Sequence, residues 1–160
     1  MHTAEHYETE YSRQNGPIEY AAAAQPKSSA AEILASASFF SSISQAELAQ
    51  LLSKSAEETY EGGDEIVIQG EYADSTYVVL SGQVRVVQSL SDTTDVCVAE
   101  LGPGEVFGEL GVLRSRPRNA TVLTLKRTRC VRIPAARFLA ILDGSTNISM
   151  ALLRIVAGRV

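Results

Sequence analysis

The sequence predicts a mainly β protein: an antiparallel β-roll of the jelly-roll or double-stranded β-helix kind, with helices at both ends. Residues 57–133 consist of short β-branched runs separated by glycines, a pattern typical of small antiparallel barrels and rolls. Over residues 30–56 and 134–160, apolar residues recur at helical spacing instead. A chain of 160 residues, 45% of them hydrophobic, is long enough for one domain with a real core.

Residues 1–29 are predicted to form a flexible N-terminal tail ahead of a domain over residues 30–160. The tail has few aliphatic residues and many polar ones, so it buries too little surface to offset its ordering entropy. Whether one of its tyrosines docks on the domain stays open.

Two helices are expected between the tail and the roll. The first, SSAAEILASASFF, ends at Phe39 and Phe40. The second begins at Ser44, a predicted N-cap, and Glu47 three residues later predicts a capping box. Its apolar face consists of Leu48, Leu51 and Leu52.

The roll itself is predicted from six short runs with glycine turns between many of them. The runs are EIVIQG, STYVVLSG, QVRVVQSL, DVCVAELG, NATVLTL and RCVRIP. Ser81 and Gly82 join the second run to the third as a turn between paired strands.

Helical spacing returns after Pro134, which suits a first helical turn, and Gly144 is a good helix stop. A second helix, in STNISMALLRIVAGRV, has an apolar side formed by Ile148, Leu152, Ile155 and Val156. Because no clear stop signal follows, we expect the natural chain to continue past residue 160. Ile148, Leu152 and Ile155 could form either a homodimer seam or a lid hinge, and the sequence does not choose between the two.

Charge is distributed unevenly along the chain, whose formal net charge is −5. Residues 1–113 hold 4 Lys/Arg and 18 Asp/Glu, whereas residues 114–160 hold 10 Lys/Arg and one Asp. Such a basic region can indicate nucleic-acid binding. It has no interleaved aromatic residues, however, so we favour the alternative that the acidic and basic parts face each other, or a partner, and that one arginine serves a ligand.

Several classes of protein are disfavoured by the sequence. The start of the chain has no secretory pattern and no apolar run is long enough to span a membrane. Cys97 and Cys130 match no metal spacing and lie in apolar runs, so we expect buried thiols and a cytoplasmic location. The only histidines, His2 and His6, lie in the tail, and no nucleophile–base or metal-ligand cluster indicates an enzyme or a metal cofactor.

The stretch GEVFGELGVLRSRPRNATV, residues 104–122, combines glycines, one carboxylate and nearby arginines, which favours a site for a small anion. Gly108 allows the backbone to approach a ligand closely. A short helix over Glu109 to Leu113 would present unpaired amides in its first turn. Arg118 would add a charge-assisted contact to phosphate oxygens.

This stretch closely resembles the phosphate-binding cassette of cyclic nucleotide-binding domains, such as those of catabolite activator protein, the regulatory subunits of cAMP-dependent protein kinase and cyclic nucleotide-gated channels. It reads Phe107-Gly108-Glu109-Leu110, then six residues, then Pro117-Arg118-Asn119-Ala120-Thr121. The upstream segment GEYADSTYVVLSGQVRVV resembles the family too. The resemblance covers roughly residues 38–157.

The resemblance implies a set of ligand-binding residues: Phe107, Gly108, Glu109, Leu110, Gly111, Arg118, Asn119 and Ala120. In this pattern Glu109 accepts a hydrogen bond from the ribose 2′-OH, and Arg118 binds the phosphate. Val86 and Val98 are weaker candidates for the wall around ribose and base. Arg114 and Arg116 match no ligand position and are expected to be exposed.

The function implied is a regulatory sensor whose ligand is cAMP or cGMP and which needs no other cofactor. Asn119 departs from the residues usual at its position, so the preference stays open, with cAMP favoured on family frequency. The signal would pass through the C-terminal helices to a partner protein or an attached effector. Alternatives are a transcription regulator with a DNA-binding domain beyond residue 160, a regulatory module of an enzyme, transporter or channel, and a nucleotide-independent interaction domain.

Overall fold

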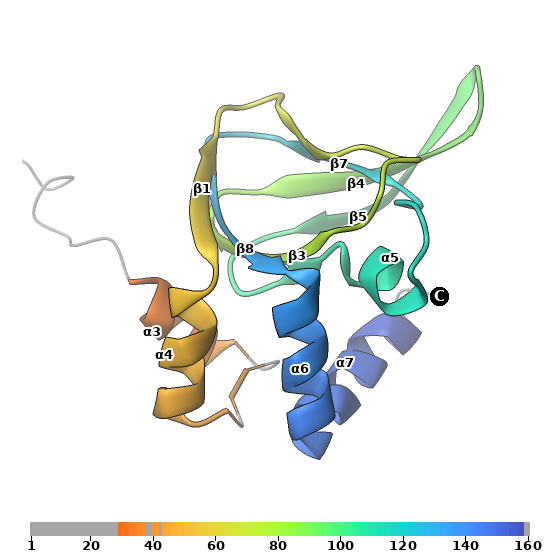
Figure 1. The fold of residues 1–160 in the computed structure, drawn as a ribbon. Coiled ribbons are helices and arrows are strands. Elements are labelled where there is room, and N and C mark those ends of the chain that lie inside the picture. Colours follow the sequence, from red (N-terminus) through yellow and green to blue (C-terminus); the bar gives the residue numbers. More distant parts are fainter. Residues whose placement is uncertain (1–28, 38–39, 42, 159–160) are drawn as a thin grey trace, which may run out of the picture.

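The computed structural model describes residues 29–37, 40–41 and 43–158 and places a two-sheet roll above a layer of helices (Figure 1). The predicted tail therefore lies outside the described residues, apart from Ser29. In chain order the elements are α3 (Ala30–Ser36), α4 (Gln45–Ser53), β1 (Ala56–Tyr60), β2 (Glu65–Val67), β3 (Ser75–Ser81), β4 (Val84–Ser91), β5 (Thr94–Leu101), β6 (Val106–Phe107), α5 (Glu109–Arg114), β7 (Thr121–Thr124), β8 (Thr128–Pro134), α6 (Ala135–Gly144) and α7 (Thr146–Gly158).

The eight strands form two four-stranded antiparallel sheets, ordered β1-β8-β3-β6 and β2-β7-β4-β5. This confirms the predicted antiparallel roll with flanking helices. The turn expected at Ser81-Gly82 joins β3 to β4, and Gly82 has a φ of 95°. A Cβ there would lie 2.6 Å from the carbonyl oxygen of Arg127, so this turn requires glycine.

Alternation along β3 and β8 divides the core into two layers. One face packs between the two sheets and includes Tyr77, Val79 and Cys130. The opposite face, which includes Val78, Leu80, Val131 and Ile133, packs against the helices through Leu34, Phe40, Leu51, Phe138, Ile148 and Leu152. The sheet β1-β8-β3-β6 is thus the central layer, and it connects the roll interior to the helices.

Helix boundaries differ from the prediction at the N-terminal side. The first helix ends at Ser36, before Phe40, and Phe39 lies outside the described residues. Ser44 is the N-cap of α4 as predicted, and its Oγ accepts the N–H of Glu47 at 3.1 Å. A complete capping box forms one helix earlier, between Ser29 and Glu32. The predicted helical region to residue 56 overlaps the start of β1, whose AEETY sequence carries little β-branched character.

The two cysteines do not share one environment, and the expectation that both are buried is wrong for Cys97. Cys130 is fully buried between the sheets, and burial raises the pKa of its thiol to about 12. Cys97 is exposed because β5 is the edge strand of its sheet and residues 94–98 are all exposed. Both are free thiols.

The acidic and basic parts of the chain meet in the fold. Ion pairs join arginines of the basic C-terminal third to carboxylates of the first two thirds: Arg118–Asp74, Arg127–Glu61, Arg129–Glu57 and Arg132–Asp74. For these arginines the acidic and basic parts of the chain therefore face each other, as one of the favoured alternatives predicts.

Among the described residues, no single helix has the length and apolar character needed to cross a membrane. Helices α6 and α7 meet that criterion only when taken together, and the chain bends by 115° between them. Their inner faces are occupied by the core contacts of Phe138, Ile148 and Leu152.

Candidate functional site

The cassette stretch forms β6, the short helix α5 and the segment leading to β7, at one end of the roll (Figure 1). The predicted helix over 109–113 is present and extends to Arg114. Gly108 is its N-cap with a φ of 79°, a left-handed conformation that favours glycine. Arg114 and Arg116 are exposed, as expected.

A cavity of about 180 Å³ lies beside this stretch, between the cassette and the strands of the second sheet. The cassette contributes Phe107, Gly108, Glu109, Leu110 and Asn119. The opposite wall is formed by Val86, Gln88, Val98, Ala99, Leu101 and Val122. The ring of Phe107 is fixed by parallel stacking on Tyr77, with ring centroids 5.0 Å apart.

Glu109 is an unusual feature of the cavity because it is an acidic residue of which only 1% is exposed. Buried carboxylates are rare unless they are paired. Glu109 is the first residue of α5, where the helix dipole favours negative charge. The cavity therefore combines mainly apolar walls with one buried carboxyl group.

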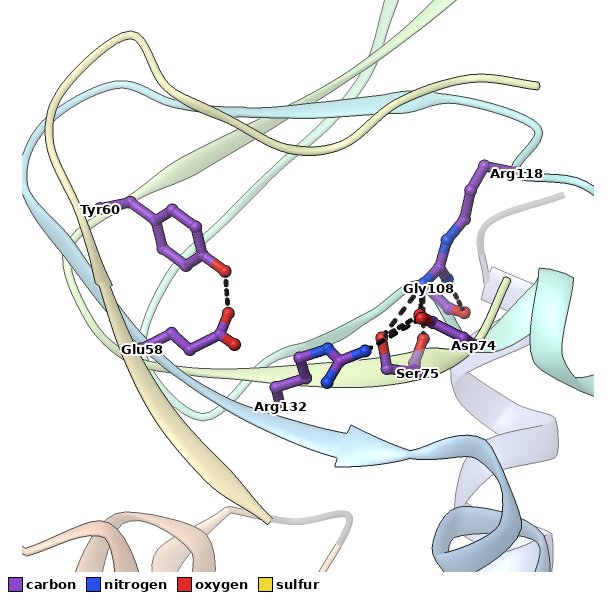
Figure 2. Close-up of polar contacts among 7 residues, drawn as sticks. All are labelled: Glu58, Tyr60, Asp74, Ser75, Gly108, Arg118 and Arg132. Atoms are coloured by element: carbon purple, nitrogen blue, oxygen red, sulfur yellow. Dashed lines mark hydrogen bonds and ion pairs between the residues drawn. The ribbon is translucent and has the colours of Figure 1, made fainter. Parts of the chain in front are cut away.

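Arg118 belongs to the cassette stretch but does not line the cavity, and its guanidinium contacts Gly108 and Ser75 (Figure 2). Its Nη1 donates to the carbonyl of Gly108 and its Nη2 to the carbonyl of Ser75, both at 2.7 Å. Only 6% of the residue is exposed, and burial lowers the pKa of its guanidinium. The backbone of Arg118 is held by Gly70 and Glu71, each through a hydrogen bond of 2.8 Å.

Asp74 and Ser75 connect Arg118 to a second arginine (Figure 2). The Ser75 hydroxyl donates to Asp74 Oδ1 at 2.8 Å, and Arg132 Nη2 donates to Oδ2 at 3.0 Å. Arg118 Nη2 lies 3.8 Å from Oδ1. The Ser75 hydroxyl, followed by Arg132 and Arg118, holds the pKa of Asp74 below its usual value. Asp74 is therefore ionised at neutral pH.

Two glycines allow the cassette to pack closely. A Cβ on Gly108 would lie 2.7 Å from Arg118 Nη1, and a Cβ on Gly111 would lie 2.6 Å from the Cβ of Ala73. Gly111 thus determines how closely α5 approaches the segment that precedes β3. It lies behind the cavity wall, as does Ala120.

The structure therefore brings Phe107, Gly108, Glu109, Leu110 and Asn119 together with Val86 and Val98 around one cavity, while Gly111, Arg118 and Ala120 support it from behind. No role at the site was predicted from the sequence for Asp74, Ser75, Gln88 or Arg132. The segment GEYADSTYVV, quoted for its resemblance, contained a signal for Asp74 and Ser75. Arg132 and Gln88 gave none, because a single polar residue in a strand reads as solvent-facing.

The described residues contain no group of three or more His, Cys, Asp or Glu side chains placed to hold a metal ion. His2 and His6 lie outside the described residues, so the structure does not bear on them.

Comparison with known proteins identifies the family and the kind of fold. The model of the cyclic nucleotide-binding domain matches residues 57–145, which is more than half of the chain. A cAMP-dependent protein kinase regulatory subunit from Dictyostelium discoideum is 38% identical over 82 residues, 49% of this chain and 25% of that protein. A CRP-like cAMP-activated global transcriptional regulator from Mycobacterium tuberculosis is 27% identical over 128 residues, 80% of this chain and 57% of that protein.

Among solved structures, catabolite activator protein from Thermus thermophilus is similar, with a TM-score of 0.68 and 27% identity. The match covers 77% of this chain and 58% of that chain. The chain thus spans between a quarter and about three fifths of the length of these relatives.

Proposed function

Because the chain belongs to the cyclic nucleotide-binding domain family, we propose that it is a regulatory sensor that binds cAMP in preference to cGMP and signals through its C-terminal helices. The observation that carries the proposal is the pairing of a buried carboxylate, Glu109, with a buried guanidinium, Arg118, on the two sides of Gly108. A cyclic nucleotide offers a hydroxyl donor and an anionic phosphate, and this pair matches the two groups.

The ligand contacts follow from the chemistry of each side chain. Glu109 accepts a hydrogen bond from the ribose 2′-OH. Arg118 exchanges part of its bonding to the Gly108 and Ser75 carbonyls for charge-assisted bonds to the phosphate. Phe107, Leu110, Val86 and Val98 surround the ribose and base with apolar surface, and the amides of Gln88 and Asn119 reach polar atoms at the cavity edge.

The preference for cAMP rests on the curated relatives, which are named for cAMP dependence or activation. Asn119 is exposed and lines the cavity, so it faces either the phosphate or the base. An amide both donates and accepts hydrogen bonds, so it does not by itself choose between the two bases.

The proposed signal runs from the cassette to α6 through one residue. The backbone oxygen of Asp74 accepts the first amide of α6, that of Ala135, at 2.9 Å. Its side chain contacts Ser75 and Arg132 and lies beside Arg118. A movement of Arg118 toward a ligand therefore changes the environment of the residue that anchors α6. Differential affinity for two arrangements of α6 and α7 is then sufficient for regulation.

The module performs no chemistry of its own in this proposal. Its output is a contact made or released by α6 and α7 with a partner protein or a linked effector domain, including a second copy of α7. The two free thiols agree with a reducing cytoplasmic setting.

Calorimetric titration with cAMP and cGMP, on folded protein stripped of co-purified ligand, tests the proposal. We expect micromolar or tighter binding of cAMP and at least tenfold weaker binding of cGMP. Tighter binding of cGMP overturns the preference alone. Binding of neither nucleotide overturns the sensor function and leaves a nucleotide-independent interaction domain.

A further inference from the structure

We propose that Arg132 is a positioning residue: it forms an ion pair with Asp74 and so leaves the guanidinium of Arg118 available to an anionic ligand. The inference rests on the proposed function of the cassette as a nucleotide site. Its basis is a single carboxylate that lies between two guanidiniums (Figure 2).

The distances show which side chains form hydrogen bonds with the Asp74 carboxylate. Arg132 Nη2 is 3.0 Å from Oδ2, and the Ser75 hydroxyl is 2.8 Å from Oδ1. Arg118 Nη2 is 3.8 Å from Oδ1, beyond hydrogen-bond distance. Each oxygen of Asp74 thus has a nearer partner than Arg118, and the Arg118 guanidinium is directed at the carbonyls of Gly108 and Ser75 instead.

This arrangement affects ligand binding because carbonyls and a carboxylate compete differently for an arginine. A neutral carbonyl gives up a guanidinium to a phosphate more readily than a carboxylate does, because a carboxylate adds the Coulomb attraction between two full opposite charges to the hydrogen bond. The side chain of Arg118 is only 5% exposed, so a close ion pair with Asp74 would be weakly screened. By binding Oδ2, Arg132 keeps the Asp74 carboxylate from forming a close ion pair with Arg118.

The position of Arg132 suits this role. It lies on β8 opposite Tyr77 of β3, on the strand face that is directed into the roll. Burial lowers the pKa of Arg132, but Tyr77, Asp74 and Glu58 outweigh this effect and raise it. Arg132 is therefore a permanent cation held beside Asp74, and its backbone pairs with β1 and β3 whatever its side chain does.

Arg132→Gln in a double-mutant cycle with Asp74→Asn tests the inference, with calorimetric affinity for the more tightly bound nucleotide as readout. We expect Arg132→Gln to weaken binding about fivefold, the upper end for a partly exposed ion pair. Arg132→Lys should restore affinity to within about twofold. In the Asp74→Asn background, Arg132→Gln should change affinity by less than about twofold, because the competing carboxylate is gone.

Arg129→Gln is the matched control, because Arg129 lies on the same strand and pairs with Glu57 instead. We expect it to change affinity by less than about twofold. Unchanged affinity in Arg132→Gln, or an equal loss with and without Asp74, would overturn the inference. The second result would show that Arg132 acts only as a distant positive charge.

A measurement without nucleotide separates this inference from the proposed function. The Nε–H resonance of Arg118 reports its bonding partners by NMR. We expect it to shift in Arg132→Gln and to stay in place in Arg129→Gln. An unmoved resonance in Arg132→Gln refutes the positioning role even if the nucleotide binds, whereas wild-type protein that binds neither nucleotide refutes only the sensor function.

Discussion

The two walls of the cavity differ in how firmly they are held. The cassette wall consists of Phe107 to Leu110 and Asn119, and Arg118 supports it. Glu109 and Arg118 are 1% and 6% exposed, and backbone carbonyls fix the arginine. The hairpin wall consists of β4 and β5, where Val98 is 48% exposed and the edge strand has no outer neighbour in its sheet. The groups that would bind phosphate and ribose are therefore fixed in advance, while the groups around the base are free to adapt.

The two walls should therefore contribute differently to the affinity for a ligand. Polar groups that are already held in place lose little conformational entropy when a ligand binds, so removing one of them should lower the affinity strongly. Exposed apolar residues on an edge strand contribute little each, and their neighbours compensate. Substitutions should accordingly have large effects on the cassette wall and small ones on the hairpin wall.

The largest effect is expected from Arg118→Ala. A hydrogen bond to a charged group contributes about 1.5–3 kcal/mol, so the affinity for cyclic nucleotide should fall at least tenfold. The exposed Arg114 is the control, and Arg114→Ala should cause less than about twofold change. Calorimetric titration measures both. Equal losses would mean that general positive charge holds the ligand.

Glu109→Ala should abolish discrimination between a cyclic nucleotide and its 2′-deoxy analogue. A hydrogen bond from the ribose hydroxyl to a carboxylate is worth about 1.5 kcal/mol, so wild-type protein should prefer the ribose form about tenfold. Glu109→Gln retains an acceptor and should keep part of that preference. Competition binding with the two analogues provides the ratio, and a ratio unchanged in Glu109→Ala removes Glu109 from the ribose.

Gly108→Ala should have an intermediate effect of about fivefold on affinity. The new Cβ would lie 2.7 Å from Arg118 Nη1, and the φ of 79° adds roughly 1–2 kcal/mol of backbone strain. Gly102→Ala, where a Cβ meets open space, is the control. Urea unfolding and titration should show both losses at residue 108 and neither at residue 102; equal behaviour would refute close packing at the cassette.

Val98→Ala should have the smallest effect, less than about twofold in affinity and roughly 0.5 kcal/mol or less in stability. The side chain is half exposed and loses little buried surface on truncation. Titration and urea unfolding give the two values. A tenfold loss of affinity would show that β5 closes over the ligand and would end the distinction between the two walls.

Much of this fold could be predicted from the sequence, because glycines and β-branched runs report local backbone conformation directly. Local residue types predicted a site for a small anion, including Gly108 and the start of α5, and the resemblance of FGEL and PRNAT to a known family identified the cassette. Strand β1 was missed since its AEETY sequence acquires strand structure only by pairing with β8. The burial of Cys97 was predicted wrongly, because apolar neighbours in sequence do not reveal that a strand lies at the edge of a sheet.

Arg132 shows the same limit at the site. Its role depends on Asp74, 58 residues earlier in the chain, and on the register that places Arg132 opposite Tyr77. Periodicity within RCVRIP identifies a strand but not the residue that its side chain meets. Long-range polar pairs of this kind are fixed by topology, so they emerge only when the sheets are assembled.

The position of β8 inside its sheet has a consequence for biosynthesis. Among the described residues this strand is the last in sequence, yet it lies between β1 and β3, and Ala56 pairs with Arg132. On the ribosome, the central sheet cannot close until residues 128–134 have left the exit tunnel. Contacts so distant in sequence slow folding, because loop-closure entropy is lost before the pairing is gained. Strands β1 and β3 therefore lack their pairing partner until the segment that carries Arg132 has been synthesised.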